Sequence, residues 1–237
     1  MTSGTSMASE ETTADTGSLL RVALILNVAT LVVGVAAGAA SEPWRHLWSI
    51  VLVALPWVAV ALVARYEPVY HFGEEQIGRQ GDLTLPLSLP GIFLTQGWVK
   101  DFEPLNWKPA VLLAVILAFA LTFAATRVDR ELSKAAIYIL AVAAFAYGYG
   151  AGMILDAGLD RSTPQIYPVT VLGKYESRAR GTSWNLNVSP WGSRTGADHV
   201  PVSPARYRAT RPGDTVCVYL RSGALGVAWY AADSCKQ

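Results

Sequence analysis

The residues best suited to chemistry gather at 71–75, where the sequence reads HFGEE. An imidazole and two carboxylates near a membrane surface could bind a divalent cation or act as a general base. The HExxH spacing of zinc hydrolases is absent, and a solvated loop is the preferred explanation. His71, Glu74 and Glu75 are therefore the candidates for a metal site, while the sequence itself predicts no catalytic residue and no cofactor.

Other signatures of catalysis or nucleic-acid binding are missing. The chain has no GxSxG elbow, no Walker phosphate loop and no GxGxxG fingerprint, so hydrolase, nucleotidase and dinucleotide chemistry are not indicated. Residues 156–237 carry ten Lys/Arg and six Asp/Glu, a net charge of +4. This excess is modest for a protein that stacks bases on aromatic side chains, so nucleic-acid binding is not expected.

The two cysteines, Cys217 and Cys235, both lie in the C-terminal part of the chain. No CxxC motif or Cys/His cluster accompanies them, which argues against a structural zinc site. They form one disulfide if the compartment is oxidising, or remain two unrelated thiols. Spacing alone does not decide between these alternatives.

Four long apolar runs predict the helices that position these residues. None contains Asp, Glu, Lys or Arg, and each has 18 to 21 residues: 22–40, 47–64, 109–126 and 135–155. A helix needs roughly 20 apolar residues to cross the hydrocarbon core of a bilayer. Only 16% of the whole chain is charged, against about 25% in a soluble domain. The sequence therefore predicts an α-helical membrane bundle of four transmembrane helices.

The remaining segments divide the chain further. Residues 1–18 predict a disordered acidic tail before a transmembrane domain over 19–156. The loop 65–108 contains an apolar part, 83–99, that prolines and a glycine interrupt. We expect that part to be interfacial or re-entrant rather than a fifth span. Asp101 and Glu103 follow it, near the membrane boundary.

Beyond residue 164 the apolar pattern shortens to that of strands. Segments rich in Val, Tyr, Trp and Thr alternate with Gly, Pro, Ser and Asp, and they predict strands at 166–175, 182–188, 199–202, 215–220 and 227–230. Five short strands over 164–237 indicate an all-β small barrel or sandwich of SH3-like or OB-like size.

Small residues recur four apart within two of the runs. Gly34 and Gly38 form one GxxxG pair, and Gly148 and Gly152 form another. Such pairs lie on one helix face and allow close approach of another backbone. Packing within the bundle is the preferred explanation, and the alternative is the seam of a homo-oligomer.

A four-span count puts both termini and the long loop on one side of the membrane, and the short loops on the other. Three basic residues, Arg127, Arg130 and Lys134, crowd one short loop, although the raw basic count slightly favours the other side as cytoplasmic. We give more weight to density near span ends, which predicts extracytoplasmic termini in the inner (plasma) membrane. The cysteine pair suits that oxidising side.

The C-terminal motifs VSPARY (202–207), PGDTVCV (212–218) and GALGVAWY (223–230) resemble the end of uncharacterised bacterial inner-membrane proteins. In those, a few spans precede a small β domain that closes on a Gly-Asp turn and a Gly-rich hairpin. The pattern is also similar to the β domains of NfeD-like and DUF3592-like membrane proteins. The resemblance implies a bacterial envelope protein and supplies no catalytic residues.

Three functions are compatible with these patterns. The first is non-enzymatic: a membrane protein that presents its β domain to a protein partner or an envelope component. The second is a transporter or channel component, with Asn27, Pro56 and segment 83–99 near the path. The third is a membrane-interface enzyme that uses the 71–75 loop. Spans without ionisable residues favour the first.

Overall fold

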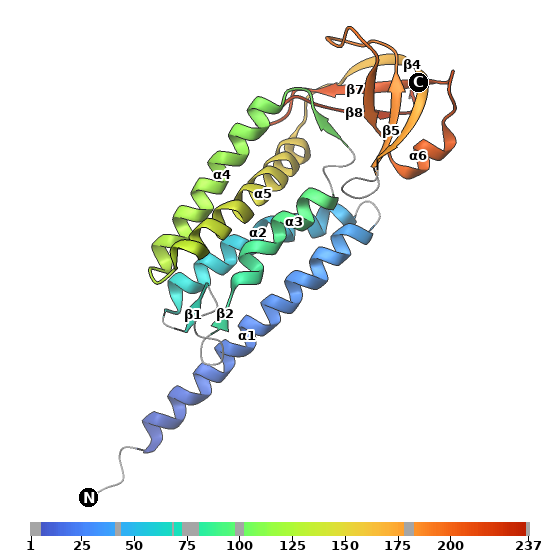
Figure 1. Cartoon of the computed structure of the whole chain (residues 1–237). Helices are drawn as coiled ribbons and strands as arrows, with labels where there is room; N and C mark the ends of the chain where they lie inside the picture. The colour runs from blue at the N-terminus through green and yellow to red at the C-terminus, as the bar shows by residue number, and fades with distance from the viewer. Residues whose placement is uncertain are drawn as a thin grey trace, which may run out of the picture. The chain divides into compact units, whose positions relative to one another are not determined.

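A computed structural model describes most of the chain, in six stretches: residues 6–40, 44–67, 69–72, 81–97, 102–177 and 183–235 (Figure 1). The chain divides into two compact units. The first unit comprises 1–94 and 116–147, and the second comprises 95–115 and 148–237.

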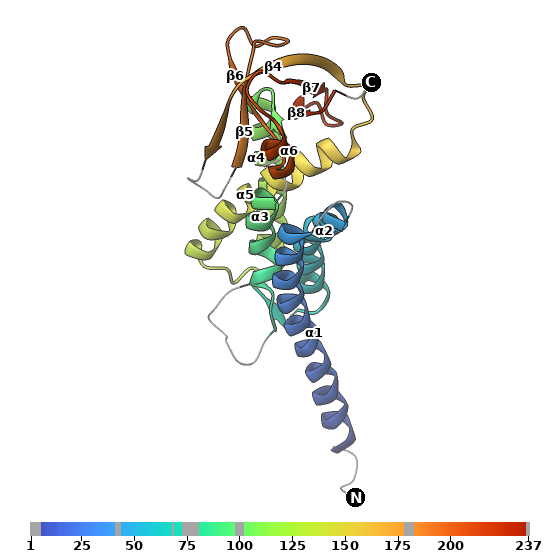
Figure 2. The ribbon, with the colours of Figure 1, turned by 90° about the vertical axis from the view of Figure 1, so that its right-hand side faces the viewer.

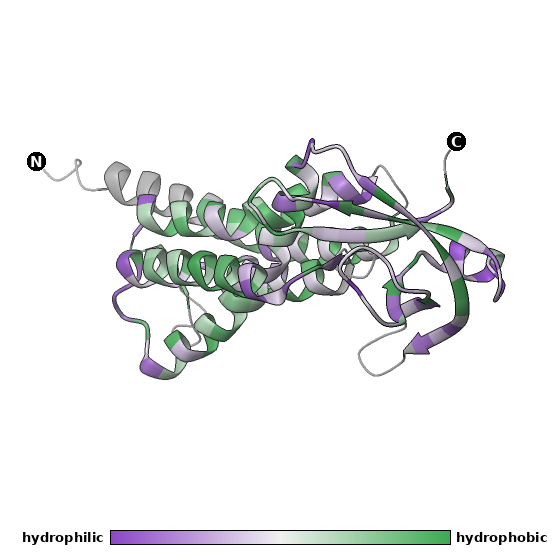
Figure 3. Ribbon diagram, turned by 90° about the horizontal axis from the view of Figure 1, so that it is seen from above, coloured by the Kyte–Doolittle hydropathy of each residue, from purple (hydrophilic) through white to green (hydrophobic). Residues whose placement is uncertain are grey.

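Five helices contain nearly all of the apolar residues predicted to lie in the membrane: α1 (Ser6–Ala39), α2 (Trp44–Arg65), α3 (Thr84–Gly97), α4 (Trp107–Val128) and α5 (Lys134–Leu159). Four of them are long and apolar enough to cross a bilayer, which confirms the predicted spans. Figure 3 shows hydrophobic residues along these helices. Helix α1 begins at Ser6 and so includes most of the segment predicted as a disordered tail.

Helix α2 contains Pro56 and makes polar contacts with α5 beside it. A proline inside a helix removes one backbone hydrogen bond and displaces the preceding turn. The Tyr147 hydroxyl donates to the Val53 carbonyl at 2.7 Å and accepts a hydrogen bond from Trp57 Nε1 at 2.9 Å. The altered turn of α2 therefore keeps polar partners without water, as a membrane-embedded helix requires.

Helix α3 is regular where the sequence predicted an interrupted, interfacial segment. Pro86 lies in its first turn, where a missing N–H costs little, and only Pro90 lies in its interior. Leu87 and Leu94 are almost completely buried. Tertiary packing in the first unit therefore outweighs the low helix propensity of this segment.

Two contacts show that α3 runs parallel to α1. At the start of α3, Asn27 Nδ2 of α1 donates to the Asp82 carbonyl at 2.7 Å. Further along, the position of a Cβ on Gly34 would lie 2.2 Å from the ring of Phe93. The partners advance in the same direction along both helices, so the two helices point the same way.

One end of the first unit gathers three chain segments. Strand β1 (Tyr70–His71) pairs in parallel with β2 (Gly81–Asp82). The Tyr70 hydroxyl donates to the Leu19 carbonyl of α1 at 2.8 Å, and the Phe72 N–H donates to Asp129 Oδ2 at 2.8 Å. The loop after α2 thus meets the loop between α4 and α5.

The second unit contains a six-stranded antiparallel sheet that nearly closes into a barrel, in the order β3-β8-β7-β4-β5-β6. Its strands are β3 (Glu103–Pro104), β4 (Gln165–Ser177), β5 (Ser183–Val188), β6 (Asp198–Pro201), β7 (Thr215–Arg221) and β8 (Trp229–Asp233). The five C-terminal strands lie at or next to the predicted segments, and the predicted class, a helical bundle plus a small β domain, is confirmed. Strand β3, supplied by the residues before α4, was not predicted.

Strand β4 makes the sheet curve. Its first half pairs with β7 and its second half with β5, and the register shifts between Val171 and Gly173 (Figure 2). A bulge of this kind bends a strand and increases its twist. The curved sheet encloses an apolar core of valines and aromatic rings, among them Trp191 and Tyr230.

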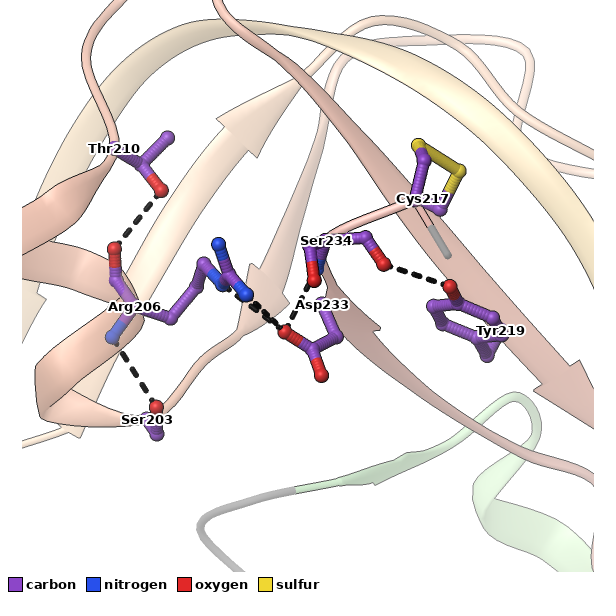
Figure 4. Close-up of polar contacts among 8 residues, drawn as sticks. Ser203, Arg206, Thr210, Cys217, Tyr219, Asp233 and Ser234 are labelled. Atoms are coloured by element: carbon purple, nitrogen blue, oxygen red, sulfur yellow. Dashed lines mark hydrogen bonds and ion pairs between the residues drawn. A yellow bond between two sulfur atoms is a disulfide. The ribbon is translucent and has the colours of Figure 1, made fainter. Parts of the chain in front are cut away.

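The last strand is fastened at its C-terminal end (Figure 4). A disulfide joins Cys217 of β7 to Cys235, which decides an alternative that the sequence left open. Arg206 Nε, on the short helix α6 (Pro204–Ala209), donates to Asp233 Oδ1 at 3.0 Å. The Tyr219 hydroxyl donates to the Ser234 carbonyl at 2.7 Å. Covalent and polar contacts together hold the end of β8 against its neighbours.

Candidate functional site

The segment before α4 contributes both an edge strand and a helix cap to the second unit. Glu103 lies opposite Tyr230 in the β3–β8 ladder, and the Leu105 N–H continues the pairing by donating to the Ala228 carbonyl at 2.7 Å. Asn106 then caps α4, because its Oδ1 accepts the Lys108 N–H at 3.0 Å. A strand and a helix start only a few residues apart fix the backbone on both sides of Glu103.

Glu103 is a half-buried carboxyl held by a tyrosine. The Tyr230 hydroxyl donates to Glu103 Oε2 at 3.0 Å. Burial raises the pKa of Glu103 above its ordinary value, and the hydrogen bond from Tyr230 opposes that rise. The pKa of Tyr230 is also raised, first by burial and then by the nearby negative charge of Glu103. Tyr230 therefore stays protonated and remains a donor to the carboxylate.

An open pocket of about 180 Å³ lies beside this carboxyl. Its lining comes from β3, the start of α4, α5, β5 and β6: Phe102, Glu103, Pro104, Trp107, Tyr149, Ser183, Asn185 and Pro201. Glu103 is the one ionisable carboxyl or basic group among these eight residues. The other polar groups are two hydroxyls, an amide and an indole N–H, so the pocket is weakly polar with one acidic position.

Aromatic rings form the apolar part of this pocket. Trp107 stacks on Tyr149 with ring centroids 5.8 Å apart and an interplanar angle of 10°. Phe102 is buried and packs on Trp229 at 5.3 Å. The Tyr149 hydroxyl is buried and has no hydrogen-bond partner among the described residues. A buried donor without a partner is costly, so this hydroxyl is a polar group that the surrounding structure leaves unsatisfied.

Two aspartates at the end of α5 hold the β7–β8 hairpin. Asp156 is completely buried, and its Oδ1 accepts the N–H of Leu225 at 2.6 Å and that of Val227 at 3.4 Å. Asp160, one turn later, accepts the Gly223 N–H at 3.0 Å and Trp229 Nε1 at 3.1 Å. These bonds connect the last turns of a membrane helix directly to the sheet.

Gly223 allows this arrangement. Its φ of +74° is in the left-handed region, and a Cβ there would lie 2.3 Å from Asp156 Oδ2. A side chain would therefore meet both backbone strain and a direct clash. The hairpin follows the path that the aspartates require because this position is a glycine.

The candidate metal residues are only partly placed. His71 Nδ1 lies 3.9 Å from Asp129 Oδ2, an aspartate that the sequence analysis did not single out. Glu74 and Glu75 fall outside the described residues. Among the described residues, no three His, Cys, Asp or Glu side chains form a group able to hold a metal ion. A metal site in the 71–75 segment therefore stays a prediction from the sequence.

The glycine pairs occupy different surroundings. Gly34 faces Phe93 of α3, whereas in the described part of the chain no atom beyond the surrounding turns of α1 lies within 4 Å of a Cβ position at Gly38. Gly148 and Gly152 are buried in α5. A close approach to the backbone of another helix involves a glycine that we did not predict: a Cβ on Gly91 of α3 would lie 2.5 Å from the Tyr147 backbone nitrogen.

No protein-family model matches the chain, and neither a curated protein nor a solved structure resembles it. The likeness to NfeD-like and DUF3592-like proteins therefore stays an expectation from sequence. The geometry around Glu103 is the best-defined candidate site in the described residues. Sequence reasoning placed Glu103 at a membrane boundary but gave it no partner, because Tyr230 lies 127 positions away.

Proposed function

We propose that the protein is an integral protein of the bacterial inner membrane that holds its C-terminal β unit at the membrane surface as a binding module. The observation that carries this proposal is the open pocket beside Glu103, formed where the start of α4 and part of α5 meet the sheet. Asp156 and Asp160 support it, because they fix the sheet to the end of a span. The ligand is a protein or another envelope component.

The spans themselves favour anchoring over transport. The four apolar runs contain no Asp, Glu, Lys, Arg or His, and ion or substrate paths normally contain some of these residues. Asn27, which the transport alternative would place near a path, instead donates to the backbone of Asp82. The bilayer is thus the partner of the helices, and specificity belongs to the second unit.

Photocrosslinking tests this division of labour. We expect a photoreactive phenylalanine analogue at Leu172 or Leu225, both exposed on the second unit, to give specific adducts in native membranes. The same analogue at the exposed Phe119 of α4 is the matched control and should give lipid adducts only. Equal adduct patterns at all three positions would contradict a binding role for the β unit.

We further propose that the chain crosses the membrane five times, with α3 as the fifth crossing. Support comes from the parallel course of α1 and α3 and from the Phe72–Asp129 contact. The 14 residues of α3 rise about 21 Å, less than the roughly 30 Å hydrocarbon core. Leu87 and Leu94 are buried, so protein surrounds this helix. The residues just outside α3 can then lie at membrane depth without being helical, because such backbone is tolerated where protein surrounds it.

Five crossings also remove the conflict between basic residues and orientation. The side of the N-terminus then receives six Lys/Arg in loops and at span ends: Arg21, Arg65, Arg79, Arg127, Arg130 and Lys134. The opposite side receives three: Arg45, Lys100 and Lys108. The C-terminal unit is not counted, because long domains translocate largely regardless of charge. The N-terminus is then cytoplasmic and the β unit extracytoplasmic, where its disulfide is stable.

Epitope tags at both termini test this topology, which replaces the same-side arrangement expected from four spans. External protease should remove a tag after Gln237 from intact spheroplasts and leave an N-terminal tag protected. Permeabilised spheroplasts are the control and should lose both tags. Loss of both tags, or protection of both, from intact spheroplasts would show that the termini share a side and would refute the fifth crossing.

A further inference from the structure

We infer that the pocket beside Glu103 binds an ammonium group, either on a lipid headgroup of the ethanolamine type or on a small soluble amine. This inference rests on the proposed binding function and names the chemistry of its ligand. It joins four features of the pocket: one acidic group, a neutral oxygen acceptor, aromatic faces, and a position at the end of a membrane span.

The charge of the pocket selects a cation. Among the described residues of the lining, Glu103 is the one acid, and none is Lys, Arg or His. Arg194 is the nearby cation, but its Nε lies 3.3 Å from Asp198 Oδ2 and its Nη2 donates to the Leu105 carbonyl at 3.3 Å. Its charge is therefore balanced by Asp198. A phosphate or carboxylate ligand would meet the Glu103 carboxylate without a compensating cation.

The neutral polar groups suit an ammonium that donates hydrogen bonds. Asn185 Nδ2 donates to Ser183 Oγ at 3.4 Å, and this orientation leaves the Asn185 carbonyl oxygen as an acceptor. An –NH₃⁺ group has three donors, and Glu103 and Asn185 offer it oxygen atoms from two segments of the chain.

The aromatic rings add an attraction that is specific to cations. Trp107 and Tyr149 are stacked, and both line the pocket. A cation over the face of such a ring is attracted by the negative charge of the ring face, and more strongly when the cation is desolvated. A neutral ligand of the same size would gain only the apolar contact. The same rings therefore favour an ammonium over an amide or a sugar hydroxyl.

The depth of the pocket relative to the membrane indicates the source of the ammonium group. Trp107 is the first residue of α4 and is exposed, as expected for an interfacial tryptophan. Tyr149 stacks on it although α5 continues for ten more residues to Leu159. The stacked pair thus marks the membrane boundary on this side, at the depth of lipid headgroups. A lipid ammonium reaches this depth without leaving the bilayer.

Binding should depend on the protonation of Glu103. Among the described residues, the charged and titratable groups around it are Tyr230 on β8, Asp198 and His199 on β6, Tyr149 on α5, and Arg194. Burial raises the pKa of Glu103, and the Tyr230 hydrogen bond partly counteracts that rise. An ammonium needs the carboxylate form, so affinity should fall as the pH decreases through this raised pKa.

The test uses the full chain in nanodiscs made of phosphatidylglycerol alone. Isothermal titration with phosphoethanolamine and with ethanolamine should detect binding to the wild-type protein. Nanodiscs that also contain phosphatidylethanolamine should retain that lipid on the protein in native mass spectrometry. Binding of the soluble amines without retention of the lipid identifies a soluble amine as the ligand source. Retention of phosphatidylethanolamine identifies a lipid headgroup.

Variants make the test specific to the pocket. Glu103→Gln keeps an acceptor for Tyr230 and should weaken binding at least tenfold, and Trp107→Ala should weaken it severalfold. Glu176→Gln, the same change on β4 outside the lining, is the matched control and should bind like wild type. Thermal unfolding checks that each variant is folded.

Two outcomes would overturn the inference. The first is equal affinity of wild type and a folded Glu103→Gln variant. The second is the absence of binding from both amine sources, or tighter binding of inorganic phosphate than of ethanolamine. If photocrosslinks at Leu172 or Leu225 persist in that case, the binding module stands and only the ligand class is wrong. If they are absent too, the proposed function also fails.

Discussion

Replacing Asp156 with Ala should release the β7–β8 hairpin from α5 and destabilise the second unit. Asp156 Oδ1 accepts two backbone N–H groups, from Leu225 and Val227. An unsatisfied buried donor costs about 1–3 kcal/mol, so we expect a loss of roughly 2–4 kcal/mol. Hydrogen exchange at residues 223–227 should accelerate while exchange in α2 stays unchanged, and the thermal midpoint should fall.

Two further variants separate hydrogen bonding from charge and from the loss of any aspartate. Asp156→Asn retains a carbonyl oxygen, so it should recover most of the lost stability if acceptance by Oδ1 is what matters. Glu131→Ala, at an exposed acid in the loop after α4, should leave exchange in the hairpin unchanged. Hairpin protection that is equal in wild type and Asp156→Ala would show that β8 is held by its ladder with β7 alone.

The hairpin contact shows which parts of the architecture local sequence can encode. Asp156 is visible in the sequence as an acid just beyond an apolar run, which predicts a headgroup position. Its partners lie 69 and 71 residues later, and nothing in the local pattern connects them. Length and composition suffice for the four spans because each run satisfies the bilayer requirement by itself. A buried acid that caps a distant hairpin has no comparable local signal.

The sequence analysis missed short elements for a different reason. Strand β3 has two residues, too few for the alternation that marks a strand, and it forms because β8 offers an edge. The pocket beside Glu103 combines side chains from 102–107 with Tyr149, Asn185 and Pro201. Its lining is defined by tertiary structure, so the sequence analysis could list its acid but not its neighbours. Helix α3 was missed because prolines lowered its apparent helicity, although packing overrides that signal.

That packing leads to the second large effect: Gly91→Ala should destabilise the first unit even though alanine is the better helix former. Alanine normally gains about 1 kcal/mol over glycine inside a helix. At Gly91 the added Cβ would lie 2.5 Å from the Tyr147 nitrogen and 2.9 Å from its Cα. Overpacking against backbone costs typically about 1–3 kcal/mol, so α3 must move away from α5 or no longer pack on it.

Gly38→Ala supplies the matched control, because no described residue outside the neighbouring turns of α1 has an atom within 4 Å of its Cβ position. The same chemical change should therefore have opposite signs: lower stability at Gly91 and equal or higher stability at Gly38. Unfolding of both variants in detergent by heat or denaturant measures the difference. An increase in stability at Gly91 would mean that α3 does not pack on α5.

Gly34 of α1 allows a side-chain clash with α3 to be compared with the backbone clash at Gly91 of α3. A Cβ at Gly34 would meet the ring of Phe93, which can be shortened, whereas the obstacle at Gly91 is backbone and cannot. Gly34→Ala should thus be rescued by Phe93→Leu, while no side-chain substitution at Tyr147 should rescue Gly91→Ala. Both results together would fix α3 between α1 and α5, surrounded by spans rather than lying on the membrane surface. Only a helix in that position can carry the chain across the membrane and leave the two termini on opposite sides.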